Sequence, residues 1–140
     1  MHAVKTVGLY LGIALANVAI AADEPFTGVF NGTGRACSGA LYVRTTTIEW
    51  NSTYRVCKRG RYEILEKNLT ADRKRIVYRL KNRSKHCRYE VVEVEHASGY
   101  GWNVGGYQSL EAFQKRDLPD WNNSALPERQ VLSCPMIGSD

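Results

Sequence analysis

Apolar and polar residues alternate in short segments along most of the chain, and turn residues separate these segments. In RIVYRLKN (75–82), isoleucine, tyrosine and leucine occupy one face of an extended segment. Arginine and lysine occupy the other face, and Val77 is the one apolar residue among them. Side chains alternate between the two faces of a strand, so this pattern predicts half-buried strands. The segments that show it are 26–30, 39–45, 47–53, 62–68, 75–82, 88–96, 101–107 and 130–134.

Seven or eight short strands, spaced about ten residues apart, predict an antiparallel barrel or sandwich. One short helix is expected after Ser109, which is a favourable N-cap, and Pro119 is expected to end it. The segment DLPDWNNSALPER (117–129) is expected to be an irregular loop. We therefore predict a mainly β fold, a small antiparallel barrel of seven or eight strands with one short helix and two disulfides.

The N-terminal segment 1–21 has the pattern of an export signal. A short basic start precedes an apolar run, and Ala19-Ile20-Ala21 is a cleavage site with small residues, so we predict cleavage before Ala22. The run is short for a membrane span, and the rest of the chain contains no second one. The alternative for this segment is a buried N-terminal helix. Residues 22–140 are enough for a single β-barrel domain, which we expect to be periplasmic or secreted.

The four cysteines of the chain predict two disulfides, because an exported chain matures in an oxidising compartment. Cys57 and Cys87 precede the first and third strands of a meander, and these two strands start at the same end of the sheet. Cys134 belongs to the last strand, which must pair with an early strand if the barrel closes, so its expected partner is Cys37. We therefore predict the bridges Cys57–Cys87 and Cys37–Cys134.

Groups that could carry catalysis or bind a metal are few. A zinc site assisted by His86 or His96 is an alternative to the disulfides, but the cysteines are at least twenty residues apart and lack knuckle spacing. A hydrolase could use the acidic pair Glu93 and Glu95, or His96, but the chain has no G-x-S-x-G motif and no cysteine left as a nucleophile. We expect no enzyme activity, no metal and no other cofactor.

Charge is segregated along the chain. Residues 55–88 contain thirteen Lys or Arg against three acidic residues, whereas 89–140 contain three against eight. A basic surface of this kind can bind a polyanion such as an anionic envelope polymer, and the alternative is a solvated strand face. Nucleic acid is not the expected partner, because Tyr62 and Tyr78 alternate with core positions and are expected to be buried. The predicted basic surface consists of Lys58, Arg59, Arg61, Arg75, Arg79, Lys81, Arg83 and Lys85.

The segment HASGYGWNVGGYQ (96–108) concentrates glycine and aromatic residues. Trp102 follows the strand periodicity and is expected in the core, while Gly105 and Gly106 are expected to break or bulge the strand. Tyr100 lies between two glycines and is expected to be exposed. We predict that the tip of this segment is a contact loop, formed by Ser98, Gly99, Tyr100 and Gly101.

The Ser-Gly-Tyr sequence at 98–100, within this strand plan, resembles the periplasmic lysozyme inhibitors. In that family a Ser-Gly loop enters the cleft of the enzyme, although the longer family motif after Ser-Gly is absent here. This resemblance implies an inhibitor-like or immunity-like role. The frame formed by GRACSGALYV (34–43) and LSCPM (132–136) also resembles uncharacterised bacterial exported barrel proteins.

The sequence thus predicts an exported, non-catalytic binding protein whose partner is another protein or an anionic envelope polymer. A lipocalin-like carrier of a small apolar ligand is the alternative. A carrier needs an empty interior, whereas this chain has enough aromatic residues to fill a narrow barrel.

Overall fold

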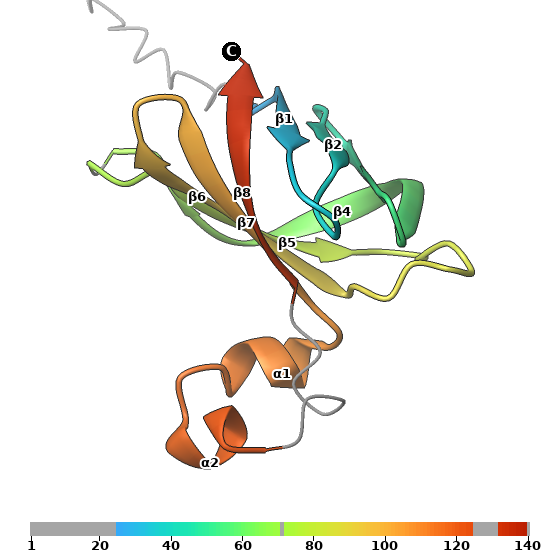
Figure 1. Ribbon diagram of the computed structural model, residues 1–140, viewed down its shortest axis with the longest axis vertical. Helices are drawn as coiled ribbons and strands as arrows, with labels where there is room; N and C mark the ends of the chain where they lie inside the picture. The colour runs from blue at the N-terminus through green and yellow to red at the C-terminus, as the bar shows by residue number, and fades with distance from the viewer. Residues whose placement is uncertain (1–24, 71, 125–131, 140) are drawn as a thin grey trace, which may run out of the picture.

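The computed structural model describes residues 25–70, 72–124 and 132–139, so the predicted export signal lies outside the described residues. Eight strands form a closed antiparallel barrel in which each strand pairs with its neighbour in sequence and the last pairs with the first (Figure 1). The predicted small barrel is confirmed. Its strands are β1 (Gly28–Gly32), β2 (Gly39–Val43), β3 (Thr47–Ser52), β4 (Val56–Asn68), β5 (Arg75–Leu80), β6 (Val91–Ser98), β7 (Gly101–Tyr107) and β8 (Leu132–Ser139).

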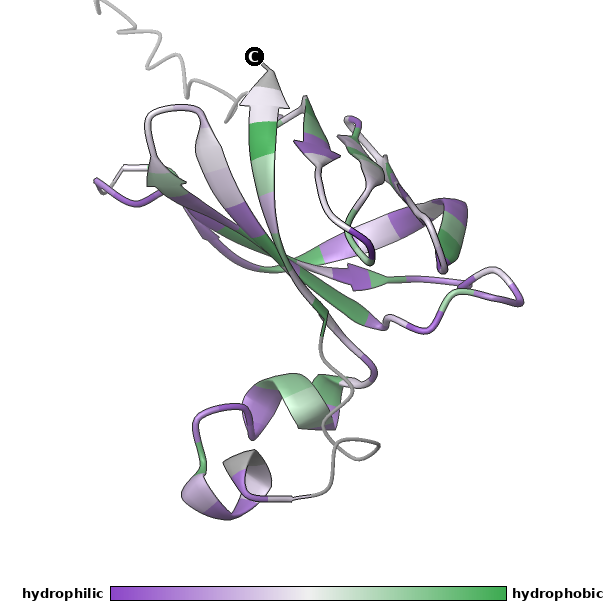
Figure 2. Ribbon diagram, viewed as in Figure 1, coloured by the Kyte–Doolittle hydropathy of each residue, from purple (hydrophilic) through white to green (hydrophobic). Residues whose placement is uncertain are grey.

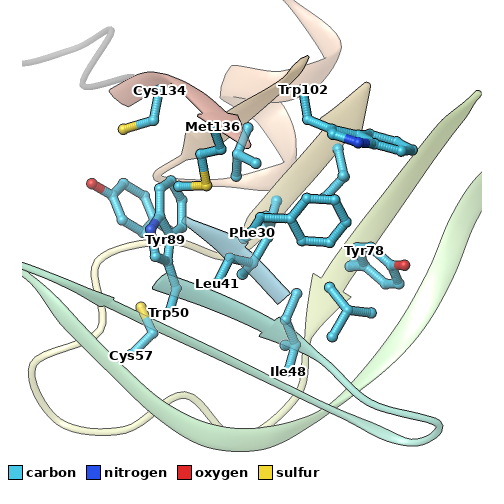
Figure 3. Close-up of a cluster of buried hydrophobic side chains, with 14 of the residues drawn as sticks. Phe30, Leu41, Ile48, Trp50, Cys57, Tyr78, Tyr89, Trp102, Cys134 and Met136 are labelled. Carbon is cyan, nitrogen blue, oxygen red and sulfur yellow. The ribbon is translucent and has the colours of Figure 1, made fainter. Parts of the chain in front are cut away.

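Apolar side chains from alternate positions of the strands fill the interior of the barrel (Figure 3). The rings of Trp50 and Tyr89 stack with their centroids 4.9 Å apart, and Phe30 packs edge-on against Trp102 at 5.2 Å. Tyr78 is also buried in this core, as predicted. An eight-stranded barrel has an interior just wide enough for side chains, so these rings occupy the space that a carrier would keep open.

Two glycines that face the interior make room for the aromatic pairs. A Cβ atom at Gly106 would lie 2.6 Å from the Tyr89 ring and 2.9 Å from Trp50. A Cβ atom at Gly138 would lie 2.7 Å from the indole nitrogen of Trp102. The prediction that Gly105 and Gly106 interrupt the strand is wrong, because β7 continues through both without a register shift. Gly106 therefore leaves space for the packed rings of Tyr89 and Trp50 and does not bend the strand.

Helix α1 (Leu110–Gln114) covers an apolar patch on the outer face of the barrel. Ser109 caps it, because its hydroxyl accepts a hydrogen bond from the backbone N–H of Ala112 at 3.0 Å. Phe113 of the helix is buried against Val77 and Val91, one from β5 and one from β6. The apolar residue on the otherwise polar face of β5 is therefore explained by the helix that covers it.

The region after α1 differs from the prediction. A second short helix, α2 (Pro119–Asn122), replaces the first part of the expected loop, so the prediction of a single helix is wrong. Pro119 starts this helix rather than ending α1, because proline is well tolerated in the first turn, where its missing N–H has no helical partner. Residues 125–129 of the predicted loop lie outside the described residues.

Many strand boundaries differ from the predicted ones by one to three residues, and the largest differences are at the start of β4 and the end of β8. Strand β4 begins at Val56 rather than at residue 62. The earlier start was not predicted, because residues 58–61 are charged or glycine and show no apolar alternation. Gly60 and Arg61 pair with Ile48 and Thr47 of β3, and residues 58–59 lie at the register shift between Ile48 and Trp50. Cys134 lies near the start of β8, not at its end, because β8 continues to Ser139.

Both predicted disulfides are confirmed. Cys37–Cys134 and Cys57–Cys87 join Cα atoms 5.5 Å and 4.4 Å apart. Both bridges lie at the end of the barrel that carries loops 33–38, 53–55 and 81–90, which we call the disulfide end. The other end, which we call the hairpin end, carries turns 44–46, 69–74 and 99–100. Two disulfides are compatible with an oxidising, extracytoplasmic environment.

None of the helices among the described residues has the length and apolar content needed to cross a membrane.

Candidate binding surfaces at the two ends of the barrel

The predicted basic stripe on β5 is largely neutralised by glutamates of the neighbouring strands. Its two arginines, Arg75 and Arg79, point to the outer face, as the alternation predicted, and both are only partly exposed. Arginine at the centre of several carboxylates adds little free positive charge to the surface. Arg75 contacts Glu66, Glu93 and Glu95, and Arg79 contacts Glu63 and Glu90.

The groups considered for catalysis are engaged in contacts of their own. Glu93 and Glu95 share Arg75 on the outer face of the barrel. The Nε2–H of His96 donates a hydrogen bond to the backbone carbonyl of Gly99 at 2.7 Å. These side chains hold strands and a turn in place.

The other residues of the predicted basic surface lie on β4 and on the loop between β5 and β6, where Figure 2 shows hydrophilic colouring over much of the chain. The guanidinium of Arg83 donates to the backbone carbonyl of Gln108 at 3.4 Å. Within residues 25–70, 72–124 and 132–139, the following basic residues form no ion pair: Lys58, Arg59, Arg61, Lys81, Arg83 and Lys85.

A pocket of about 590 Å³ opens at the disulfide end, between the β3–β4 turn and the β5–β6 loop. We call it the basic pocket, and its lining residues are Tyr54, Arg55, Val56, Lys85, His86 and Arg88. Its volume lies within the range of small-molecule sites. The three permanent cations of its lining, Arg55, Lys85 and Arg88, form no ion pair with any described residue.

Covalent and hydrogen-bonded links fix the two walls of the basic pocket relative to each other. The disulfide Cys57–Cys87 joins the start of β4 to the β5–β6 loop. The backbone N–H of Lys58 donates to the hydroxyl of Ser84 at 3.1 Å, and the N–H of Cys87 donates to the carbonyl of Ser84 at 2.9 Å. The pocket is therefore preorganised, which lowers the entropic cost of binding.

The positive charges of the pocket converge above the barrel core. The guanidinium carbon of Arg55 lies 5.7 Å from the centre of the Tyr89 ring. Burial raises the pKa of the Tyr89 hydroxyl, and the positive charges of Arg55 and Arg88 offset part of this rise. The positive charges of both guanidinium groups therefore reach the same hydroxyl, that of Tyr89 beneath the pocket. At its rim, Tyr54 is 74 % exposed and Val56 is 42 % exposed.

The loop at 98–101 forms the β6–β7 turn at the hairpin end. Ser98 pairs with Gly101, and Gly99 adopts a left-handed backbone (φ +55°) that glycine accommodates without strain. The hydrogen bond from His96 to the carbonyl of Gly99 holds the turn in one shape. Tyr100 at the tip is 76 % exposed, as predicted.

The residues beside this turn extend its surface. Trp102 is buried, as predicted, with 8 % of its surface exposed. Ile137 of β8, the pairing partner of Gly101, is 61 % exposed. A small pocket of about 210 Å³ adjoins the turn, and its lining includes His96, Tyr100 and Trp102.

Of the residues that line the basic pocket, only Lys85 belongs to the predicted basic surface. His86 was considered only as a zinc ligand, and the sequence pattern did not single out Tyr54, Arg55, Val56 and Arg88. Their signal was present in the predicted disulfide. Tyr54 and Arg55 closely precede Cys57, and His86 and Arg88 flank Cys87, so the bridge itself brings the four together. Comparison of this chain with protein-family models, curated proteins and solved structures gave no match.

Proposed function

We propose that this protein is an exported, non-catalytic binding protein that holds an anionic envelope polymer at the disulfide end of its barrel. The observation that supports this most strongly is the basic pocket. Arg55, Lys85 and Arg88 converge there without an ion-pair partner among the described residues. A concave site lined by charges of one sign focuses the electrostatic field and attracts ligands of the opposite sign.

Charge around the pocket supports a polymer rather than an isolated ion. Lys58 follows the disulfide cysteine of β4, and Arg59 is exposed next to it. Lys81 and Arg83 lie in the same loop as Lys85. A chain of repeating anions can contact the pocket and these flanking cations together, which adds to affinity without a new site.

Binding at the surface, without turnover, is consistent with the rest of the barrel. The interior is filled by aromatic and aliphatic side chains, which supports a surface site over a carrier cavity. Glu93, Glu95 and His96 are engaged in structural contacts, which supports binding over hydrolysis. The two disulfides support an exported, periplasmic or secreted protein.

Retention of the protein on immobilised dextran sulfate is expected to fall steeply with salt, because each neutralised charge releases counterions. Arg55→Glu combined with Lys85→Glu is expected to lower the slope of log affinity against log salt by roughly two, because two cations no longer neutralise a sulfate group. The matched control is Lys67→Glu with Arg73→Glu, which makes the same change of charge near the β4–β5 turn at the hairpin end. If both double variants elute at the same salt concentration, binding depends on net charge and the proposed site is wrong.

A protein partner contacted through the 98–101 loop is the second candidate. The observation that favours it is an exposed tyrosine on a turn held in one shape, beside the exposed Ile137. Tyrosine at such positions is a frequent hot spot of protein interfaces. Lysozyme is the partner that the Ser-Gly-Tyr resemblance suggests. Inhibition of a lysozyme that is abolished by Tyr100→Ala would establish this role.

A further inference from the structure

We propose that the basic pocket recognises a phosphate ester attached to a ring, a chemistry found in phosphorylated sugars and in nucleotides. This inference rests on the proposed function, because it names the group of the anionic partner that enters the pocket. It is carried by three properties of the pocket, namely the number of its cations, the exposed aromatic ring at its rim, and its volume.

The pocket has more cationic side chains than are needed to neutralise the single charge of one carboxylate. Arg55, Lys85 and Arg88 carry permanent charges, and the imidazole of His86 adds a further nitrogen to the lining. A phosphate monoester carries a charge of about −1.5 to −2 near neutral pH and offers three acceptor oxygens. A phosphate monoester therefore matches these cationic side chains better than a carboxylate does. A guanidinium group also donates two parallel hydrogen bonds to two oxygens of one phosphate.

An aromatic ring and an aliphatic side chain stand beside these cations. Tyr54 is 74 % exposed, and Val56, two residues further along the chain, is 42 % exposed. The strand periodicity buries Tyr78 fully and Tyr62, contrary to the prediction, only in part, and it does not apply to Tyr54, which lies in the β3–β4 turn. An exposed ring next to basic residues is the arrangement on which flat groups stack beside a bound phosphate. This residue therefore supplies the part of the site that recognises the ring.

The volume of the pocket sets the size of the ligand. At about 590 Å³ it is larger than a bare phosphate ion needs and falls within the range of small-molecule sites. The disulfide Cys57–Cys87 and the hydrogen bond from Lys58 to Ser84 hold the walls at this separation. One phosphorylated ring unit, free or within a polymer, fits within this volume.

Calorimetric titration of the disulfide-intact protein tests this inference with four probes. They are glucose 1-phosphate, adenosine monophosphate, glucuronate and inorganic phosphate. At least one ring phosphate is expected to bind about tenfold or more tightly than either glucuronate or inorganic phosphate. The one that binds more tightly identifies the ring as a sugar or a nucleobase.

Two variants separate the parts of the site. Tyr54→Ala is expected to remove the advantage of the ring phosphate over inorganic phosphate, while Arg88→Ala weakens both by about tenfold. The matched control is Arg73→Ala, at the hairpin end, which is expected to change neither affinity. Thermal melts of all three variants establish that they fold.

Three outcomes overturn the inference. If glucuronate binds as tightly as the ring phosphates, the pocket does not prefer phosphate. If inorganic phosphate binds as tightly as the ring phosphates, Tyr54 does not recognise the ring. Absence of binding by all four probes overturns it entirely. If dextran sulfate is still retained through Arg55 and Lys85 in these cases, the proposed polymer-binding function stands and only the inference fails. If that retention is also independent of the two residues, both fail.

Discussion

Trp102→Ala is expected to lower the free energy of unfolding by about 3–5 kcal/mol, the usual cost of truncating a buried large aromatic residue. The indole packs against the rings of Phe26, Phe30 and His96, whose centroids lie 5.6, 5.2 and 4.9 Å away. Gly138 leaves the space that the indole occupies, so its removal opens a cavity that the strand backbone cannot close. Denaturant unfolding of the wild type and the variant measures the difference.

Tyr100→Ala is the matched control, since it removes an aromatic ring two residues away that is exposed. Surface substitutions of this kind usually change stability by less than about 0.5 kcal/mol. If the two variants unfold at the same denaturant concentration, the 98–101 loop contributes to the core. Its assignment as a contact surface would then be wrong.

Removal of the Cys37–Cys134 bridge by a double alanine substitution is expected to cost about 5 kcal/mol, from the loop-closure entropy of the unfolded chain. The bridged residues are 97 positions apart, against 30 for Cys57–Cys87, whose removal is expected to cost about 4 kcal/mol in the same treatment. Either cost is a large fraction of the net stability of a small domain. Equilibrium unfolding of the two double variants measures both costs.

The order of the two costs follows from loop length alone, because both values come from the same entropic relation. A larger destabilisation on removal of Cys57–Cys87 would contradict it. That result would show that the shorter bridge stabilises the folded barrel directly, through the walls of the basic pocket.

The alternation of apolar and polar residues was sufficient to predict the barrel, because each face of a strand is set by its own sequence. The same alternation predicted that Ile76 and Tyr78 face inward and Arg75 outward. The disulfide pairing followed from strand order, since the meander brings Cys57 and Cys87 together and barrel closure brings the last strand, with Cys134, beside the first. These features depend on local pattern and topology alone.

Features that depend on register could not be predicted. The neutralisation of Arg75 requires Glu93 and Glu95 of β6 and Glu66 of β4 to lie beside it, and the residue pairing across a sheet is not visible in one strand. The two central arginines of the predicted basic stripe are therefore paired rather than free. The early start of β4 was missed for a related reason, since this part of the strand is set by the pairing of residues 56–57 and 60–61 with β3 and not by apolar alternation.

The basic pocket could be predicted from the sequence only in part. Its residues flank the predicted disulfide, so their proximity was implied by the cysteines, whereas the exposure of Tyr54 was not. A tyrosine in a β-rich sequence is usually half-buried. Only the turn between β3 and β4 places this ring in solvent beside Arg55 and Val56.

Binding of an anionic partner at the disulfide end is tested most directly by following backbone amide signals of isotope-labelled protein during titration with a short dextran sulfate. The expected result is that signals of residues 53–58 and 84–88 shift progressively, while those of the 98–101 loop stay in place. Signals that shift first at Ser98 to Gly101, or that do not shift at all, would contradict the proposed site.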